Sequence, residues 1–131
     1  YVNDFENVFL ADQIDNLEEL LTSFENETTN QIVVISIDSI DIYTDFMKYS
    51  LDLSKEWGVG QKENDNGLTI VFSKKLGKIS INTGTGTEKI ISDKFSRLTL
   101  ENLILPEFRK GNYYKGINNG LVHLMEKWVS H

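Results

Sequence analysis

Apolar residues recur along the chain at two different spacings, and this pattern predicts the order of helices and strands. Spacings of three and four residues predict amphipathic helices over residues 12–27, 43–56, 93–105 and 112–129. A nearly continuous β-branched run at residues 31–38 is typical of a strand covered on both faces. Residues 68–73 and 78–83 predict a hairpin with a short loop that contains Gly77.

The predicted order of elements is α-β-α-β-β-α-α. Because a helix connects the first two strands, we expect them to pair in parallel, whereas the hairpin pairs antiparallel. Helices before, between and after the strands predict an α/β fold, a layered sandwich with a small mixed β-sheet flanked by helices on both faces. Residues 1–9 are expected to form an irregular lead-in.

Three local expectations concern single residues at helix ends. Asp41 is the expected cap of the second helix, because its carboxylate can accept from free backbone N–H groups. Trp57 closes the apolar stripe of that helix and is predicted to be buried. Pro106 is predicted to stop the third helix, because proline lacks a backbone N–H group.

Composition and charge narrow the function classes. The chain has 131 residues, which we expect to form a single domain over residues 1–131, and no cysteine, which excludes disulfide scaffolds and thiol nucleophiles. Thirteen Lys and Arg against twenty Asp and Glu give a net charge of −7. This acidic balance argues against nucleic acid as a partner and is compatible with cation binding or with solubility alone.

Hairpin geometry predicts a candidate site. The segment before the first hairpin strand and the segment after the second should meet at one sheet edge. That edge would collect Asp65, Asn66, Glu88 and Asp93, whose oxygen atoms suit Ca²⁺ or Mg²⁺. The alternative, which spacing alone favours, is that Asp65-Asn66-Gly67 is only a turn signal and Glu88 a solvated charge.

Several known motifs do not fit these loops. An EF-hand fails because Lys62 and Ser73 would stand at the first and last ligand positions. The dinucleotide fingerprint fails because its third glycine would fall at Lys89, and a P-loop sequence is absent. Gly84-Thr85-Gly86 therefore remains either a plain turn at a strand exit or an anion-binding turn with peptide N–H groups. No catalytic residue can be assigned from the sequence.

Five ordered motifs together resemble a known family. They are Val2-Asn3-Asp4, Trp57-Gly58-Val59-Gly60-Gln61, Asp65-Asn66-Gly67, Gly84-x-Gly86-x-Glu88 with Asp93, and Pro106-x-Phe108-Arg109-x-Gly111-x-Tyr113-x-x-Gly116. Their order and spacing resemble the TPM domain, found in thylakoid proteins of photosystem repair, in bacterial YgcG-like membrane proteins and in a receptor auxiliary subunit. Thr85 and Thr87 replace the apolar residues that the family often carries there.

The resemblance implies a compact α/β sandwich in an extracytoplasmic location, periplasmic or on the cell surface. It also implies a membrane tether through segments outside this chain. Some family members bind divalent cations and have acid phosphatase activity. On this basis Asp65, Asn66, Glu88 and Asp93 are expected to hold the ion, with Asp4 as a fifth ligand, and Gly84 to Gly86 to contact phosphate oxygens.

Two functions from different classes follow. The first is a divalent-cation-binding domain with weak, metal-linked acid phosphatase activity. The second is a non-enzymatic interaction module that assists the assembly or repair of a membrane protein complex. In either case the isolated domain is expected to be a monomer.

Overall fold

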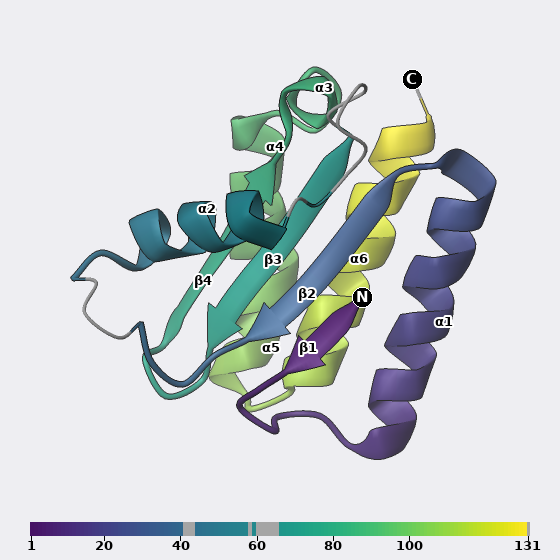
Figure 1. Cartoon of the computed structure of the whole chain (residues 1–131). Helices are drawn as coiled ribbons and strands as arrows, with labels where there is room; N and C mark the ends of the chain where they lie inside the picture. The colour runs from purple at the N-terminus through teal and green to yellow at the C-terminus, as the bar shows by residue number, and fades with distance from the viewer. Residues whose placement is uncertain (41–43, 58, 60–65, 131) are drawn as a thin grey trace.

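A mixed β-sheet forms the centre of the molecule. The computed structural model describes residues 1–40, 44–57, 59 and 66–130, and in this part of the chain the strand order is β1-β2-β3-β4 (Figure 1). The strands are β1 (Val2–Asp4), β2 (Gln31–Ser36), β3 (Gly67–Ser73) and β4 (Lys78–Thr83). β1, β2 and β3 run parallel and β4 is antiparallel to β3. The predicted β-α-β unit and hairpin are therefore confirmed.

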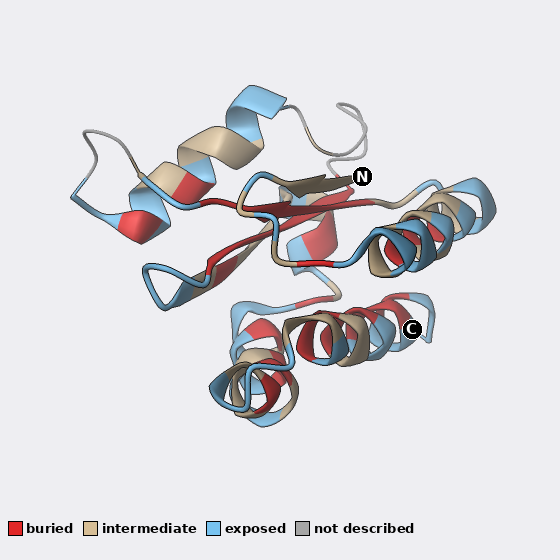
Figure 2. Cartoon of the chain, turned by 90° about the horizontal axis from the view of Figure 1, so that it is seen from below, coloured by how far each residue is buried: buried red, intermediate tan, exposed pale blue. Residues whose placement is uncertain are grey.

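Helices cover both faces of this sheet, as the sequence predicts. The helical segments are α1 (Ala11–Thr28), α2 (Phe46–Trp57), α3 (Thr85–Glu88), α4 (Asp93–Thr99), η1 (Leu100–Ile104), α5 (Leu105–Arg109) and α6 (Tyr113–Val129). Figure 2 shows α2 alone on one face, with α1, α6 and the α4–η1–α5 segment on the other. The expected layered α/β sandwich is confirmed.

The N-terminal segment is not the irregular lead-in that the sequence predicts. Residues Val2–Asp4 pair with Val34–Ser36 as a short edge strand. The Val2 backbone N–H donates to Glu18 Oε1 of α1 at 2.6 Å, which holds this strand against the helix. The Tyr1 hydroxyl donates to Glu25, and this hydrogen bond raises the pKa of Tyr1 above its ordinary value because the phenolate would face a carboxylate.

The larger apolar core lies between the sheet and α1 and α6. Alternate residues of β2 and β3, such as Val34 and Ile70, point into it and are fully buried. The predicted stripe of α6 supplies Ile117, Leu121 and Leu124, which are also fully buried. The apolar residues that recur every second position in the strands and every three to four positions in the helix thus pack into one core.

On the opposite face, hydroxyl groups hold α2 against the sheet. Ser50 of α2 is fully buried and hydrogen bonds with Ser80 of β4, while Asn82 Nδ2 donates to Ser50 Oγ at 2.5 Å. One turn later, Ser54 Oγ lies 2.8 Å from Thr69 Oγ1 of β3. Because each hydroxyl has a partner, the polar layer costs little in desolvation.

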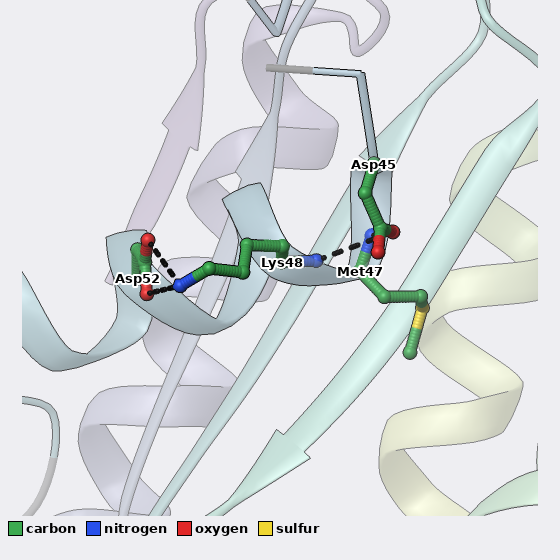
Figure 3. A network of polar contacts seen from close by, with 4 residues as sticks. All are labelled: Asp45, Met47, Lys48 and Asp52. Carbon is green, nitrogen blue, oxygen red and sulfur yellow. Dashed lines mark hydrogen bonds and ion pairs between the residues drawn. The ribbon is translucent and has the colours of Figure 1, made fainter.

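The ends of α2 differ from the sequence prediction. Asp45 Oδ1 accepts from the backbone N–H groups of Met47 at 3.0 Å and Lys48 at 3.4 Å, and so caps the first turn (Figure 3). The predicted cap, Asp41, lies outside the described residues. Trp57 is 39% exposed, so the prediction that it is buried is wrong. At the last position of α2 its indole packs against Phe5 in an edge-to-face pair rather than in the core.

Pro106 does not stop the third predicted helix. The chain continues from α4 through a π-helical turn, η1, into α5, and Pro106 occupies the first turn of α5. At the junction the Leu105 N–H donates to the Leu100 carbonyl, five residues back. The wider turn accommodates the proline ring, which would clash with the carbonyl four residues back in a regular α-helix.

Candidate functional site

The segments before β3 and after β4 meet at one sheet edge, as hairpin geometry predicts. The Gly67 carbonyl accepts from the Gly84 N–H at 2.9 Å and from the Thr87 hydroxyl, also at 2.9 Å. In the register, Leu68 lies opposite Thr83, so α3 begins directly beside the entry to β3. We call this side of the sheet, with residues 66–67 and 84–88, the α3 edge.

Two of the predicted ligands at the α3 edge are solvent-exposed carboxylates. Glu88 is the last residue of α3 and Asp93 the first of α4, and both are exposed. Ser92 caps α4 by accepting from the Phe95 N–H at 3.1 Å, which fixes where this helix begins next to α3. Both carboxylates therefore lie at the junction of two short helices, α3 and α4, of which only α4 has a side-chain cap; Figure 1 shows the two helices next to each other.

Asn66 has a structural role at the same edge. Its side chain is nearly buried, and Nδ2 donates to the Thr29 carbonyl at 2.7 Å and to Asn30 Oδ1 at 3.3 Å. These bonds tie the entry of β3 to the end of α1 and fix the orientation of the amide. Asp65, the preceding residue in the chain, lies outside the described residues.

Asp4 does not lie with the other predicted ligands. In the register Asp4 is level with Ser36 and Phe72, at the carboxyl ends of the parallel strands. Five residue positions, about 17 Å along β3, separate Phe72 from Gly67. The Asp4 carboxylate accepts instead from Ser36 Oγ at 2.6 Å and from the backbone N–H groups of Val8 and Phe9.

The strand register therefore contradicts the prediction that Asp4 is a fifth ligand of the cation site, because Asp4 lies at the other end of the sheet. Because β1 was not expected from the sequence, its parallel pairing could not be used to place Asp4. The three hydrogen bonds show that its carboxylate shapes the turn between β1 and α1.

Gly84-Thr85-Gly86 begins a short helix rather than a turn alone. Gly84 is extended and precedes α3, whose four residues include Thr85 and Gly86. Sequence reasoning missed Thr87 in the same helix. Its side chain is buried, and its hydroxyl locks α3 onto the entry of β3. The alternation of Gly and Thr is only a weak signal for a buried threonine hydroxyl of this kind, because threonine is also common in strands.

The described donor set fits a hard cation only in part. Carboxylate and amide oxygens are suitable ligands for Ca²⁺ or Mg²⁺. Among residues 1–40, 44–57, 59 and 66–130, no group of three or more His, Cys, Asp or Glu side chains is placed to hold a metal ion. Glu88 and Asp93 are two exposed carboxylates, and the further predicted carboxylate, Asp65, lies outside the described residues.

Comparisons with known proteins identify the family and the fold. The TPM domain matches residues 2–127 of the chain. The N-terminal domain of a protein from P. gingivalis is 25% identical with a TM-score of 0.86, over 96% of this chain and 80% of that one. The BA42 protein from Bizionia argentinensis is 19% identical with a TM-score of 0.81, over 95% and 83% of the two chains.

A third solved structure shows the same fold. It is the N-terminal domain of the cg2496 protein from Corynebacterium glutamicum, 14% identical with a TM-score of 0.74, over 99% of this chain and 82% of that one. No protein with a curated description matches this chain. Within the described residues, no helix has the length and apolar character needed to cross a bilayer.

Proposed function

Because this chain belongs to the TPM domain family, we propose that it binds a divalent cation, Ca²⁺ or Mg²⁺, at the α3 edge. The observation that carries the proposal is the pair of hydrogen bonds on the Gly67 carbonyl, which joins the entry of β3 to Gly84 and Thr87. The proposed ligands are Asp65, Asn66, Glu88 and Asp93.

The electrostatics of this edge support a cation. The chain carries a net charge of −7, and Glu88 and Asp93 are exposed carboxylates at the end of α3 and the start of α4. Like charges held on neighbouring loops repel one another, and a bound divalent ion would relieve that repulsion. Exposed carboxylates also require little desolvation before they coordinate an ion.

Weak acid phosphatase activity is the proposed reaction for this site. When bound, a divalent cation supplies a Lewis acid that polarises a phosphoryl oxygen and offsets charge in the transition state. Glu88 and Asp93 would hold and orient the ion, and the segment Gly84 to Gly86 would lie against the phosphate, with the Gly84 N–H already donated to the Gly67 carbonyl. Without the ion the negative net charge would repel a phosphate ester.

Exposed apolar side chains support a second candidate function, a non-enzymatic interaction module for a membrane protein complex. Phe5 is 66% exposed and forms an edge-to-face pair with Trp57, with ring centroids 6.3 Å apart. Met47 and Leu51 on α2 are also exposed. Aromatic and methionine side chains are enriched at protein interfaces. For both candidate functions we propose an extracytoplasmic location and a membrane tether through segments outside this chain.

Thermal unfolding tests the cation site. A ligand that binds only the folded state adds about 2.7 kcal/mol at a hundred times its dissociation constant. For a chain of this length we expect Ca²⁺ to raise the melting temperature by roughly 3–6 °C over NaCl of matched ionic strength. Asp65→Ala should abolish the rise.

Glu19→Ala is the matched control, because Glu19 is an exposed carboxylate on α1, away from the α3 edge. It should leave the rise intact. Superimposable melting curves of the wild type in the two salts would overturn the cation site and leave the interaction module. A phosphatase assay of the same variants, with and without Ca²⁺ or Mg²⁺, tests the reaction separately. Activity that Asp65→Ala does not lower would contradict a metal-linked reaction.

A further inference from the structure

A concave site lies at the carboxyl end of β3, at the other end of this strand from the α3 edge. It has a volume of about 370 Å³ and is formed by the β3–β4 turn, α5 and the start of α6. Its lining includes Lys74, Lys78, Ile79, Phe108, Arg109 and Tyr113. We call it the hairpin pocket. Ligands of open α/β sheets bind outside the carboxyl ends of parallel strands, which is where this pocket lies.

Three cationic side chains surround the hairpin pocket in a chain that is acidic overall. Lys74, Lys78 and Arg109 come from two segments that lie more than thirty residues apart in the sequence. Within the described residues, Lys78 and Arg109 have no carboxylate partner. The Lys74 ammonium lies 5.5 Å from the centroid of the Tyr113 ring, a cation–π contact that holds it over the pocket.

Two acidic groups adjoin the pocket, and both have hydrogen-bond or ion-pair partners. Glu6 accepts from the backbone N–H groups of Lys74 at 2.7 Å and Lys75 at 2.8 Å, and so caps the hairpin turn. Glu107 is nearly buried and pairs with Lys110 at 3.9 Å and Lys115 at 3.8 Å. The positive charge of the pocket is therefore only partly offset by its surroundings.

The floor of the hairpin pocket is apolar. Ile79, Leu105 and Phe108 line it. The Phe108 ring packs against Tyr113 with centroids 4.7 Å apart and against the buried Phe72 at 5.4 Å. The π-helical turn before α5 and the positive φ of 82° at Gly111 bring Phe108, Arg109 and Tyr113 to the same cavity.

We propose that the hairpin pocket binds a phosphate monoester whose substituent is apolar. Arg109 presents a planar fork that can bind two phosphate oxygens, while the two lysines act as point charges for a dianion. The apolar substituent would pack on Phe108, Leu105 and Ile79. A soluble aryl phosphate and the phosphate group of phosphatidic acid share this chemistry, because both are phosphate monoesters. The site is independent of the proposed cation site, because it lies at the other end of β3.

NMR titration of the ¹⁵N-labelled protein with phenyl phosphate tests the proposal. We expect shifts at Lys74 to Ile79 and at Phe108 to Tyr113, and weaker binding by inorganic phosphate or by phenol, each of which has only half of the recognised chemistry. Arg109→Gln and Lys78→Gln should each lower the affinity about 5- to 10-fold, since each removes a charge-assisted contact at a partly screened site.

Lys55→Gln is the matched control, since Lys55 is an exposed lysine on α2, away from the pocket. It should leave the affinity unchanged. An equal loss in this variant, or inorganic phosphate binding as tightly as phenyl phosphate, would overturn the proposal as general charge attraction. Co-sedimentation with phosphatidic acid vesicles distinguishes the two sources. Binding that Arg109→Gln weakens indicates the lipid, and shifts with phenyl phosphate alone indicate a soluble ester.

Discussion

On one face of the sheet, α1, α6 and the η1 turn close over a continuous apolar core, whereas on the other face α2 alone covers a much smaller apolar cluster. The small cluster consists of Val33, Ile35, Ile37, Phe46 and Val71. Beside it, four hydroxyl groups from α2 and the sheet pair with one another. The first face is held by non-directional burial, the second by a small apolar cluster together with hydrogen bonds of fixed geometry.

A polar residue in an alternating strand pattern can either face solvent or be buried against a polar partner. Ser80 and Asn82 make β4 alternate between apolar and polar positions, which predicts a half-exposed strand. In the structure Ser80 is almost fully buried, because Ser50 of α2 supplies a hydroxyl partner. A net hydrogen bond stabilises by about 1 kcal/mol, less than burial of one large apolar side chain. We therefore expect the α2 face to be the more easily disrupted one.

The largest effect is expected on the α6 face. Leu121 is fully buried in the large core. Leu121→Ala should lower the free energy of unfolding by about 2–5 kcal/mol, because it removes buried methyl groups and leaves a cavity. Chemical denaturation followed by circular dichroism measures the loss. A change below about 1 kcal/mol would contradict the view that this face dominates stability.

A close contact between α6 and η1 gives the next largest effect. A Cβ atom added at Gly120 would lie 2.5 Å from Ile104 Cδ1, and Ile104 is fully buried. Gly120→Ala should therefore destabilise by about 1–3 kcal/mol through overpacking, although alanine favours helices. Asn119→Ala on the same helix is the control and should be neutral or slightly stabilising. If Gly120→Ala melts above the wild type, η1 is free to move away from α6.

A smaller effect is expected at the polar layer under α2. Ser50→Ala removes the partner of both Ser80 and Asn82 and should cost about 1–2 kcal/mol, because buried polar groups lose hydrogen bonds. Ser50→Ala combined with Ser80→Ala should cost less than the sum of the two single changes, because neither hydroxyl is then left unpaired. Strict additivity in denaturation curves would show that the two hydroxyls do not stabilise each other.

Long periodic segments made most of the fold predictable from the sequence. The stripe of α6 and the apolar run of β2 were correct because each buries a whole face. β1 was missed because three residues are too short for a period, and its pairing depends on β2, which is distant in the sequence. Pro106 was misjudged because the sequence does not show that a π-helical turn can absorb a proline.

Only those parts of the candidate site whose positions follow from the hairpin register could be predicted from the sequence. That register brought Gly67 to Gly84 and Thr87, as expected. Asp4 was misplaced because its position follows from β1. The hairpin pocket was not found from the sequence, since Lys78 and Arg109 meet only after α5 has folded back against the hairpin. Tertiary contacts between distant segments, rather than local propensity, set these positions.

The smallest effect is expected at Trp57, at the exposed end of α2. Its apolar stripe predicts a core residue, whose replacement by alanine would cost on the order of 3–5 kcal/mol. With 39% of the side chain exposed and Phe5 as its aromatic contact, we expect Trp57→Ala to cost at most about 1.5 kcal/mol. Phe5→Ala should add little to the Trp57→Ala loss, because both changes remove the same edge-to-face pair. A loss above about 3 kcal/mol in thermal or chemical denaturation would show that Trp57 contributes as a core residue and that the α2 face depends more on apolar burial than on its hydrogen bonds.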